Sequence, residues 1–465
     1  MNQAFHSSNA FPLRPSACPG LLRIVPALDG GICRVKLQRG ELSATQALAI
    51  ADAIDEHASG IVDLTNRANL QLRGVKRGHE NALIAALLGA ALGPRDAAHA
   101  HADDVRNVMT SPAAGCDAHA LYDTTALAAE LLSLLQSDAR CAALSPKFAL
   151  LLDGGERLMM LDHPHDIWCS ALHPRDHAEP MFALGLAGCP PVLEGHPAAL
   201  AAVPASELVA LTRALLHTFL DLAAPDHTRM RDLLAKQSVE SVLARAERES
   251  GVRLLRGQSI QSWRREPADA SRRFGAWQQR DAHRDKQRWH IGGQPALGRV
   301  NSATLRRLAL LTKEQGATLR MTPWQSVLLT DIGTANLDAT LQTLDALGLA
   351  TTTDNPLTRV IACAGSTGCV KSLADTKADA VKLAARLPDN TRVHLSGCPR
   401  SCAAAQCAPF TMLAAQNGRY DLYHTHDPRE STGFGRLLAR GLTIDEAADL
   451  LNASAAPPFD EPFDA

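Results

Sequence analysis

The sequence has no excess of charge of either sign. Lys and Arg together number 47 and Asp and Glu 49, which gives a formal net charge of −2. Neither a block of like charges nor a basic stripe is present, so no nucleic-acid partner is expected. The longest apolar run, residues 82–92, is far shorter than the ~20 residues a membrane-spanning helix needs. No apolar stretch of signal-peptide length opens the chain. We therefore expect a cytoplasmic protein without a membrane partner.

A nucleotide-binding glycine motif is also absent. No Gly-x-Gly-x-x-Gly sequence follows a predicted strand, and the glycines within 151–158 are typical of a hairpin turn. The chain is therefore not expected to bind NADH itself.

What the chain does contain is an internal duplication. Residues 60–74 and 317–331 each alternate as a strand, pass a turn centred on Thr65 or Thr322, and continue as a second strand. Residues 106–116 also align with 359–369. The same offset in residue number aligns 145–149 with 398–402. Such matches predict two copies of one unit, each a small α/β sandwich followed by a larger α/β piece.

Four cysteines stand in two tight pairs in the second copy: Cys363 with Cys369, and Cys398 with Cys402. Four thiolates can hold zinc or an iron–sulfur cluster. Zinc ribbons prefer two residues between paired cysteines, whereas these pairs enclose five and three. The spacing favours a 4Fe-4S cluster, with zinc and uninvolved core cysteines as alternatives.

The residues around these cysteines are small. Gly365, Gly368 and Gly397 would let backbone N–H groups approach the cluster sulfurs.

The first copy lacks most of these thiols. Thr110, Ser145 and Ala149 fall on three of the cysteine positions, and Cys116 alone falls on a matching cysteine. We therefore expect the second copy alone to hold the cluster.

C-x5-C followed by C-x3-C, in the second half of a duplicated chain, resembles the siroheme-dependent sulfite and nitrite reductases. The resemblance covers most of the chain. It implies an α+β, duplicated nitrite/sulfite reductase-like fold with two ferredoxin-like half-domains and two larger α/β domains about a pseudo-twofold axis. It also implies that Cys363, Cys369, Cys398 and Cys402 bind a 4Fe-4S cluster. Cys402 would then be the cysteine that bridges the cluster to a siroheme iron.

The expected boundaries follow from the duplication and the resemblance. The expected segments are two ferredoxin-like half-domains at 15–80 and 287–340, two α/β domains at 81–244 and 341–450, an exposed charged linker at 245–286 and a tail at 451–465.

The same resemblance points to basic residues that bind the anionic substrate. Arg67 lies in the turn of "LTNRANLQ", Arg106 in "VRNVMT" and Lys147 in "SPKFALL". The reductases carry a second lysine where this chain has Ala149. Each of the three basic residues has an ordinary alternative role, as a solvated side chain or a structural ion-pair partner.

Other stretches resemble one branch, the precorrin-3B synthases of aerobic cobalamin biosynthesis. They are 17–21, 30–43, 60–74 and 319–329, although Gln325 stands where that branch has arginine. The resemblance implies an O2-dependent monooxygenase that hydroxylates precorrin-3A at C-20 with γ-lactone formation. NADH-derived electrons would reach it through a separate reductase or a ferredoxin. A siroheme sulfite or nitrite reductase is the alternative, and a non-catalytic iron–sulfur carrier is a third reading.

A histidine-rich segment leaves the second cofactor open. Residues 161–177 contain His163, His165, His173 and His177 with Asp162, Asp166 and Asp176. Two histidines and a carboxylate can hold a mononuclear non-heme iron, but such segments are more often solvated loops. Siroheme and a mononuclear iron both remain alternatives beside the cluster.

Overall fold

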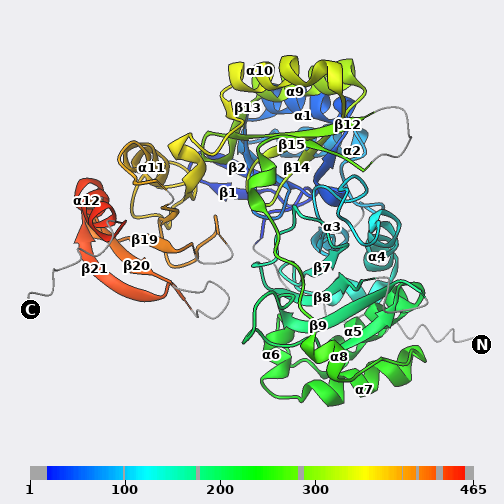
Figure 1. The fold of residues 1–465 in the computed structure, drawn as a ribbon. Coiled ribbons are helices and arrows are strands. Elements are labelled where there is room, and N and C mark those ends of the chain that lie inside the picture. The colour runs from blue at the N-terminus through cyan, green and yellow to red at the C-terminus, as the bar shows by residue number, and fades with distance from the viewer. Residues whose placement is uncertain are drawn as a thin grey trace, which may run out of the picture.

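The computed structural model describes residues 18–97, 100–173, 179–280, 287–389, 391–404, 408–425 and 433–455. Four mixed or antiparallel sheets with covering helices form the fold (Figure 1), which confirms the expected α+β class. Asp176, His177, the 281–286 part of the expected linker and residues 456–465 of the expected tail lie outside the described residues. The described part of the tail, from 451 on, belongs to a helix instead.

The first ferredoxin-like half is an antiparallel sheet with helices on one face. Its elements are β1 (Val25–Ala27), β2 (Gly30–Val35), β5 (Leu70–Val75), β4 (Ile61–Leu64), α1 (Ala44–His57) and α2 (Glu80–Gly89). Ser43 begins α1 with a capping box: its hydroxyl accepts from the Gln46 N–H, and the Gln46 side chain accepts from the Ser43 N–H.

The second ferredoxin-like half repeats this arrangement. Its elements are β11 (Gly275–Gln278), β12 (Arg288–Pro295), β15 (Val327–Gly333), β14 (Thr318–Met321), β16 (Leu349–Ala350), α9 (Ser302–Gln315) and α10 (Leu337–Ala346). The predicted turns match closely: Thr65 N–H donates to the Asn69 carbonyl and Thr322 N–H to the Ser326 carbonyl, both at 2.9 Å.

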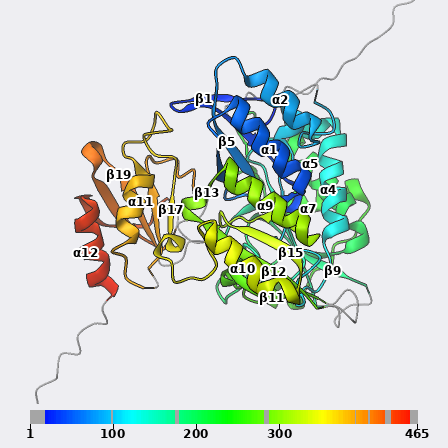
Figure 2. The same cartoon turned by 90° about the horizontal axis from the view of Figure 1, so that it is seen from above.

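The two halves exchange short edge strands. β3 (Glu41–Leu42) of the first half pairs with β14, and β13 (Arg299–Asn301) of the second pairs with β4. Each exchanged strand carries an ion pair across the junction, Glu41 with Arg320 and Asp63 with Arg299. The apolar residues of both halves form one core beneath α1 and α9, which lie side by side (Figure 2).

The two larger α/β domains share one strand order. The first contains β6 (Val108–Met109), β7 (Leu150–Asp153), β8 (His165–Ala171), β9 (Met181–Gly188) and β10 (Ala201–Pro204). Its helices are α3 (Ala100–Asp104), α4 (Thr125–Ser137), α5 (Leu208–Leu222), α6 (Met230–Leu234), α7 (Val239–Ser250) and α8 (Gln258–Ser262).

The second contains β17 (Val360–Ala362), β18 (Val393–Ser396), β19 (Phe410–Ala414), β20 (Tyr420–His424), β21 (Arg436–Leu442), α11 (Thr376–Ala384) and α12 (Ile444–Ala455). In each domain the first three strands run parallel and the last two antiparallel.

This shared order corrects one sequence match. Residues 398–402 follow β18, the second strand of their sheet, whereas Ser145 and Ala149 precede β7, the second strand of theirs. The counterpart of Cys398 and Cys402 is therefore the loop after β7, which begins at Gly154. The gapless spacing missed this because the connection before β7 is longer than the one before β18. The matches of Thr110 to Cys363 and Cys116 to Cys369 hold, since both pairs follow the first strand.

The described part of the expected linker is partly helical and mixes exposed residues with buried ones. Arg265 is 3% exposed and binds Asp153 through two hydrogen bonds, at 2.7 and 3.1 Å, while β11 joins the second half's sheet. Of the helices described, none is both long and apolar enough to span a bilayer.

Candidate functional site

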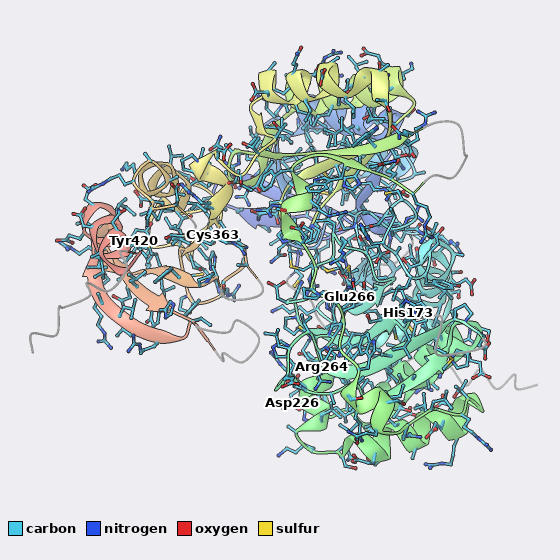
Figure 3. All side chains as sticks on the ribbon, viewed as in Figure 1. His173, Asp226, Arg264, Glu266, Cys363 and Tyr420 are labelled. Atoms are coloured by element: carbon cyan, nitrogen blue, oxygen red, sulfur yellow. The ribbon has the colours of Figure 1, made fainter. Side chains whose placement is uncertain are left out.

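The four predicted cluster cysteines gather at the carboxyl ends of β17 and β18. Cys363 directly follows β17 and Cys398 lies two residues beyond β18, and these strands are parallel neighbours. Burial raises the pKa of Cys402, and the charges of the other three cysteines raise it further, because all four lie close together. In Figure 3, Cys363 lies nearer the ferredoxin-like halves than Tyr420 does.

Backbone geometry around these thiols matches the needs of a cluster. The Gly397 N–H donates to Cys363 Sγ at 3.2 Å, as expected for a glycine that approaches a cluster sulfur. A Cβ on Gly397 would meet Ser372 Oγ at 1.8 Å, so a larger residue does not fit there. Gly365 has φ +72°, a conformation that favours glycine. The thiols and their small neighbours therefore fit a 4Fe-4S cluster.

The geometry does not suit a single metal ion. Within the described ranges, no three His, Cys, Asp or Glu side chains come close enough to share one ion. A cubane differs, since its cysteines bind separate irons around a larger core.

An arginine from the first ferredoxin-like half holds the loop after β17. This loop contains Cys363 and Cys369 and is called the cluster loop below. Arg73, on β5, is 2% exposed and binds Asp29 through two hydrogen bonds at 2.8 and 2.9 Å. Its Nη2 also donates to the Gly368 carbonyl at 3.0 Å, beside Cys369. A Cβ on Gly368 would lie 2.2 Å from this Nη2, so the close approach requires glycine.

The corresponding loop in the first half is filled by protein atoms. Cys116 is buried, burial raises its pKa to about 11, and its Sγ lies 3.2 Å from the Ala113 carbonyl. Ser111 Oγ donates to the carbonyl of Leu158, which is fully buried in the loop after β7. These contacts fill the first-copy loop with protein atoms.

Three half-buried arginines, Arg34, Arg67 and Arg229, lie near the cysteines or near one another. Burial lowers the pKa of Arg34, and the nearby Cys18 and Cys402 oppose this shift. Burial also lowers the pKa of Arg67, to about 10, and the charges of Arg229 and Arg34 add to the effect. No described residue accepts a hydrogen bond from the Arg67 guanidinium or forms an ion pair with it.

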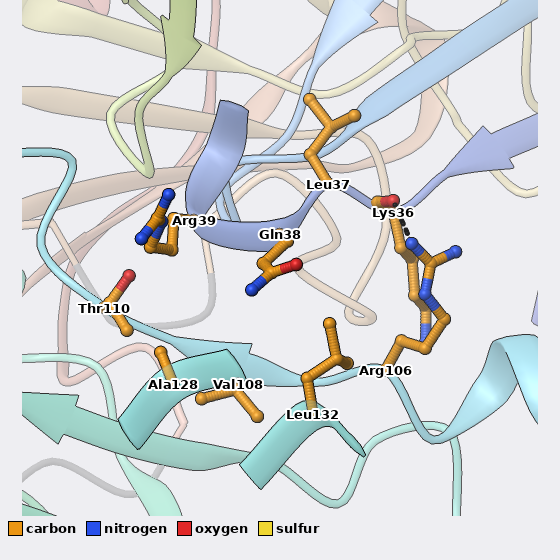
Figure 4. A pocket seen from close by; sticks show the side chains of 9 residues that line it. All are labelled: Lys36, Leu37, Gln38, Arg39, Arg106, Val108, Thr110, Ala128 and Leu132. Carbon is orange, nitrogen blue, oxygen red and sulfur yellow. Dashed lines mark hydrogen bonds between the residues drawn. The ribbon is translucent and has the colours of Figure 1, made fainter. Parts of the chain in front are cut away.

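Arg106 has several partners within the protein. Its Nη1 donates to Asp103 Oδ1 at 3.1 Å and to the Leu92 carbonyl at 3.2 Å, and its Nη2 donates to the Lys36 carbonyl at 3.1 Å. Figure 4 shows this last contact. The cavity beside it measures about 10 Å³, room for about one water molecule. These contacts give Arg106 a structural role; its role toward substrate stays a prediction.

Lys147 is exposed, and no described side chain pairs with it. Ala149 is buried, and its N–H donates to Asp166 Oδ2 at 2.8 Å. Lys147 therefore stays free to meet a ligand, whereas position 149 offers no charge.

Two histidines of the predicted iron-binding segment lie together beside Asp166. His163 and His165 are 3% and 1% exposed, with ring centroids 4.8 Å apart. Burial lowers the pKa of His163 to about 3 and lowers the pKa of His165 well below its usual range. Asp166 binds Arg229, so this carboxylate already has a partner.

Sequence reasoning missed Arg34, Arg73 and Arg229. Arg34 alternates with buried Cys33 and Val35 on β2, a polar position on a strand that could have been noticed. Nothing in the local sequence marks Arg73 or Arg229, because their partners are distant along the chain.

Comparison with known proteins places these features in one superfamily. A family model described as the nitrite and sulphite reductase 4Fe-4S domain matches residues 101–254. A second, the nitrite/sulfite reductase ferredoxin-like half domain, matches 26–90 and 281–347. Together the two models cover more than half of the chain.

Two curated relatives are equally similar in sequence. A ferredoxin–nitrite reductase of Synechococcus elongatus is 27% identical over 425 residues, with 83% of this chain and 76% of the relative covered. A precorrin-3B synthase of a Sinorhizobium species is 27% identical over 425 residues, with 87% and 82% covered. The solved structure of the Mycobacterium tuberculosis NirA protein matches with a TM-score of 0.72 at 22% identity, covering 93% of this chain and 82% of that one.

Proposed function

We propose that this chain, which belongs to the nitrite/sulfite reductase superfamily, is a precorrin-3B synthase. In this proposal the protein is an O2-dependent monooxygenase that hydroxylates precorrin-3A at C-20 with γ-lactone formation. One oxygen atom enters the product and the other leaves as water, which takes up two electrons and two protons.

The main observation that supports the proposal is the environment of Ala149. A reductase that delivers six electrons to a small oxyanion gains from every cation and proton donor beside it. Here the second lysine is replaced by a buried alanine whose N–H is bound by Asp166. Similarity to the Sinorhizobium precorrin-3B synthase along most of both chains supports the same reading.

The residues divide into two sets in this proposal. Cys363, Cys369, Cys398 and Cys402 would hold the 4Fe-4S cluster, which supplies electrons one at a time. Arg34 and Arg67 would grip substrate carboxylates, because a guanidinium fork matches a carboxylate. Their half-buried position excludes much of the competing water. An external reductase or ferredoxin would supply the electrons.

The direct test is mass spectrometry of precorrin-3A incubated with the enzyme, O2 and a reductant. A product heavier by one oxygen atom, labelled when 18O2 is used, is the expected result. Unchanged precorrin-3A with a fully loaded cluster would refute the proposal.

A siroheme-dependent nitrite or sulfite reductase is the second candidate. The similarity to ferredoxin–nitrite reductases favours it, including that of maize at 27% identity over 403 residues. Siroheme in an acid–acetone extract, together with reduction of nitrite or sulfite by dithionite-reduced methyl viologen, would establish this candidate in place of the first.

A further inference from the structure

Asp166 fixes the direction of one arginine. Its carboxylate, 1% exposed at the start of β8, accepts hydrogen bonds from the N–H groups of Ala149 and Met230 at 2.8 and 2.7 Å. Both of its oxygens also accept from Arg229 Nε at 3.0 Å. Arg229 is therefore held by one edge of its guanidinium, while no described residue accepts from its two Nη groups.

The free edge of Arg229 lies in an environment of excess positive charge. Arg67 is close enough for the two guanidinium charges to act on each other, and Asp166 is near enough to oppose them in part, although it forms no direct ion pair with Arg67. The one nearby carboxylate, Asp166, is shared among Arg229 and two backbone N–H groups. Two cations beside one engaged anion leave a net positive charge.

The two histidines on the same side do not change this balance. Burial and the charges of Arg67 and Arg229 keep His163 and His165 uncharged at neutral pH. His163 Nδ1 and both ring nitrogens of His165 are buried without a partner among the described residues. The two arginines are thus cationic and the two histidines are neutral and polar. Together these side chains suit an anionic ligand.

We propose that Arg229 and Arg67 form an oxyanion-binding site that takes a carboxylate of the tetrapyrrole substrate, with Asp166 as the residue that positions Arg229. The inference rests on the proposed function for the identity of the ligand. Arg229 supplies, from the residue before α6, a charge that position 149 has lost. A guanidinium held along one edge keeps its other donors in a fixed plane, which suits a carboxylate.

The test uses the cluster-loaded protein and uroporphyrin, a porphyrin with eight carboxylates, titrated by fluorescence quenching. Arg229→Gln should weaken uroporphyrin binding about tenfold or more with iron content unchanged. Arg229→Lys keeps the positive charge but not the forked guanidinium. Its affinity for uroporphyrin should lie between those of wild type and Arg229→Gln. Arg231→Gln is the matched control, since the Arg231 side chain is two residues away and 72% exposed. Wild-type affinity in Arg229→Gln would overturn the inference.

Asp166 is tested through Arg229 rather than by itself. If Asp166 acts by positioning Arg229, adding Asp166→Asn to Arg229→Gln should weaken binding no further. Additive losses would overturn the positioning role.

A second arm separates the possible sources of the anion. Nitrite and sulfite are titrated as competitors of uroporphyrin in wild type and in Arg229→Gln. Loss of competition by these ions in Arg229→Gln, with uroporphyrin binding intact, would overturn the carboxylate assignment in favour of a small oxyanion. A wild-type protein that binds no porphyrin carboxylate would overturn the proposed function together with this assignment. Tight wild-type binding that Arg229→Gln leaves unaltered would overturn the inference alone.

Discussion

Replacing Arg73 with Gln should loosen the cluster loop without unfolding the ferredoxin-like halves. The substitution removes the bond from Arg73 Nη2 to the Gly368 carbonyl and both bonds to Asp29. Asp29 is 31% exposed, so water compensates part of the loss on that side. A hydrogen bond from a charged donor contributes about 1.5–3 kcal/mol. Because about 1.4 kcal/mol is a factor of ten, the loop that contains Cys369 should open at least tenfold more often.

The assay measures opening and its consequence separately. Hydrogen–deuterium exchange of the peptide that spans 364–373 should quicken about tenfold, and iron release to a chelator should quicken in parallel. Arg299→Gln is the matched control, because Arg299 makes two similar bonds to Asp63 on the same sheet without touching the cluster loop. Equal iron release from both variants, or unchanged exchange in Arg73→Gln, would refute the reasoning.

Four further outcomes follow from the structure. Cys398→Ser should lose most of about four irons per chain, whereas Cys141→Ala, in the core of the first α/β domain, should retain them; retention in both would refute the ligand assignment. Arg106→Gln leaves the 1% exposed Asp103 without its ion-pair partner and should lower the melting temperature by several degrees, while Lys147→Gln, at an exposed side chain, should not. Burial lowers the pKa of His163 to about 3. Below about pH 6.5 this histidine is therefore protonated in the unfolded chain but stays neutral in the folded chain until about pH 3. Stability should therefore fall between about pH 6.5 and 3 by up to ~1.4 kcal/mol per pH unit, and His163→Gln, but not the exposed His119→Gln, should flatten this slope in urea midpoints. Gly368→Ala should release iron as Arg73→Gln does, because its Cβ would displace the Arg73 guanidinium; a stable cluster in this variant would count against the close approach.

The duplication could be predicted because each copy keeps the same local chemistry. The Thr65 and Thr322 turns are short hydrogen-bonded units that the sequence encodes directly, and the fold reproduces them. The exchange of β3 and β13 could not be predicted, since strands of two and three residues leave almost no periodic signal. The match of Ala149 to Cys402 failed for a related reason: equal spacing says nothing of where a strand lies between two loops.

The candidate site could likewise be predicted only in part from the sequence. Cysteine spacing is a strong signal because the ligands of a cluster must surround it, and the four thiols lie near enough for their charges to act on Cys402. Arginines carry no such constraint. Arg106 matched a motif yet binds Asp103 and two backbone carbonyls, whereas Arg229 matched none and lies beside Arg67. Which edge of a guanidinium remains free depends on partners tens of residues away, so only the folded chain reveals it.

Each half of the molecule uses an arginine to hold the loop after the first strand of the other half. Arg320, on β14, donates to the carbonyls of Pro112 and Ala114 at 2.9 Å, next to Cys116. Arg73, on β5, donates to Gly368, next to Cys369. The two loops are thus supported alike, and their difference lies in what fills them: buried Leu158 and Ser111 in the first, four thiols in the second. A duplicated scaffold with equal supports can therefore keep redox chemistry in one copy. In our proposal the other copy then presents Arg67 and Arg229 to an anion.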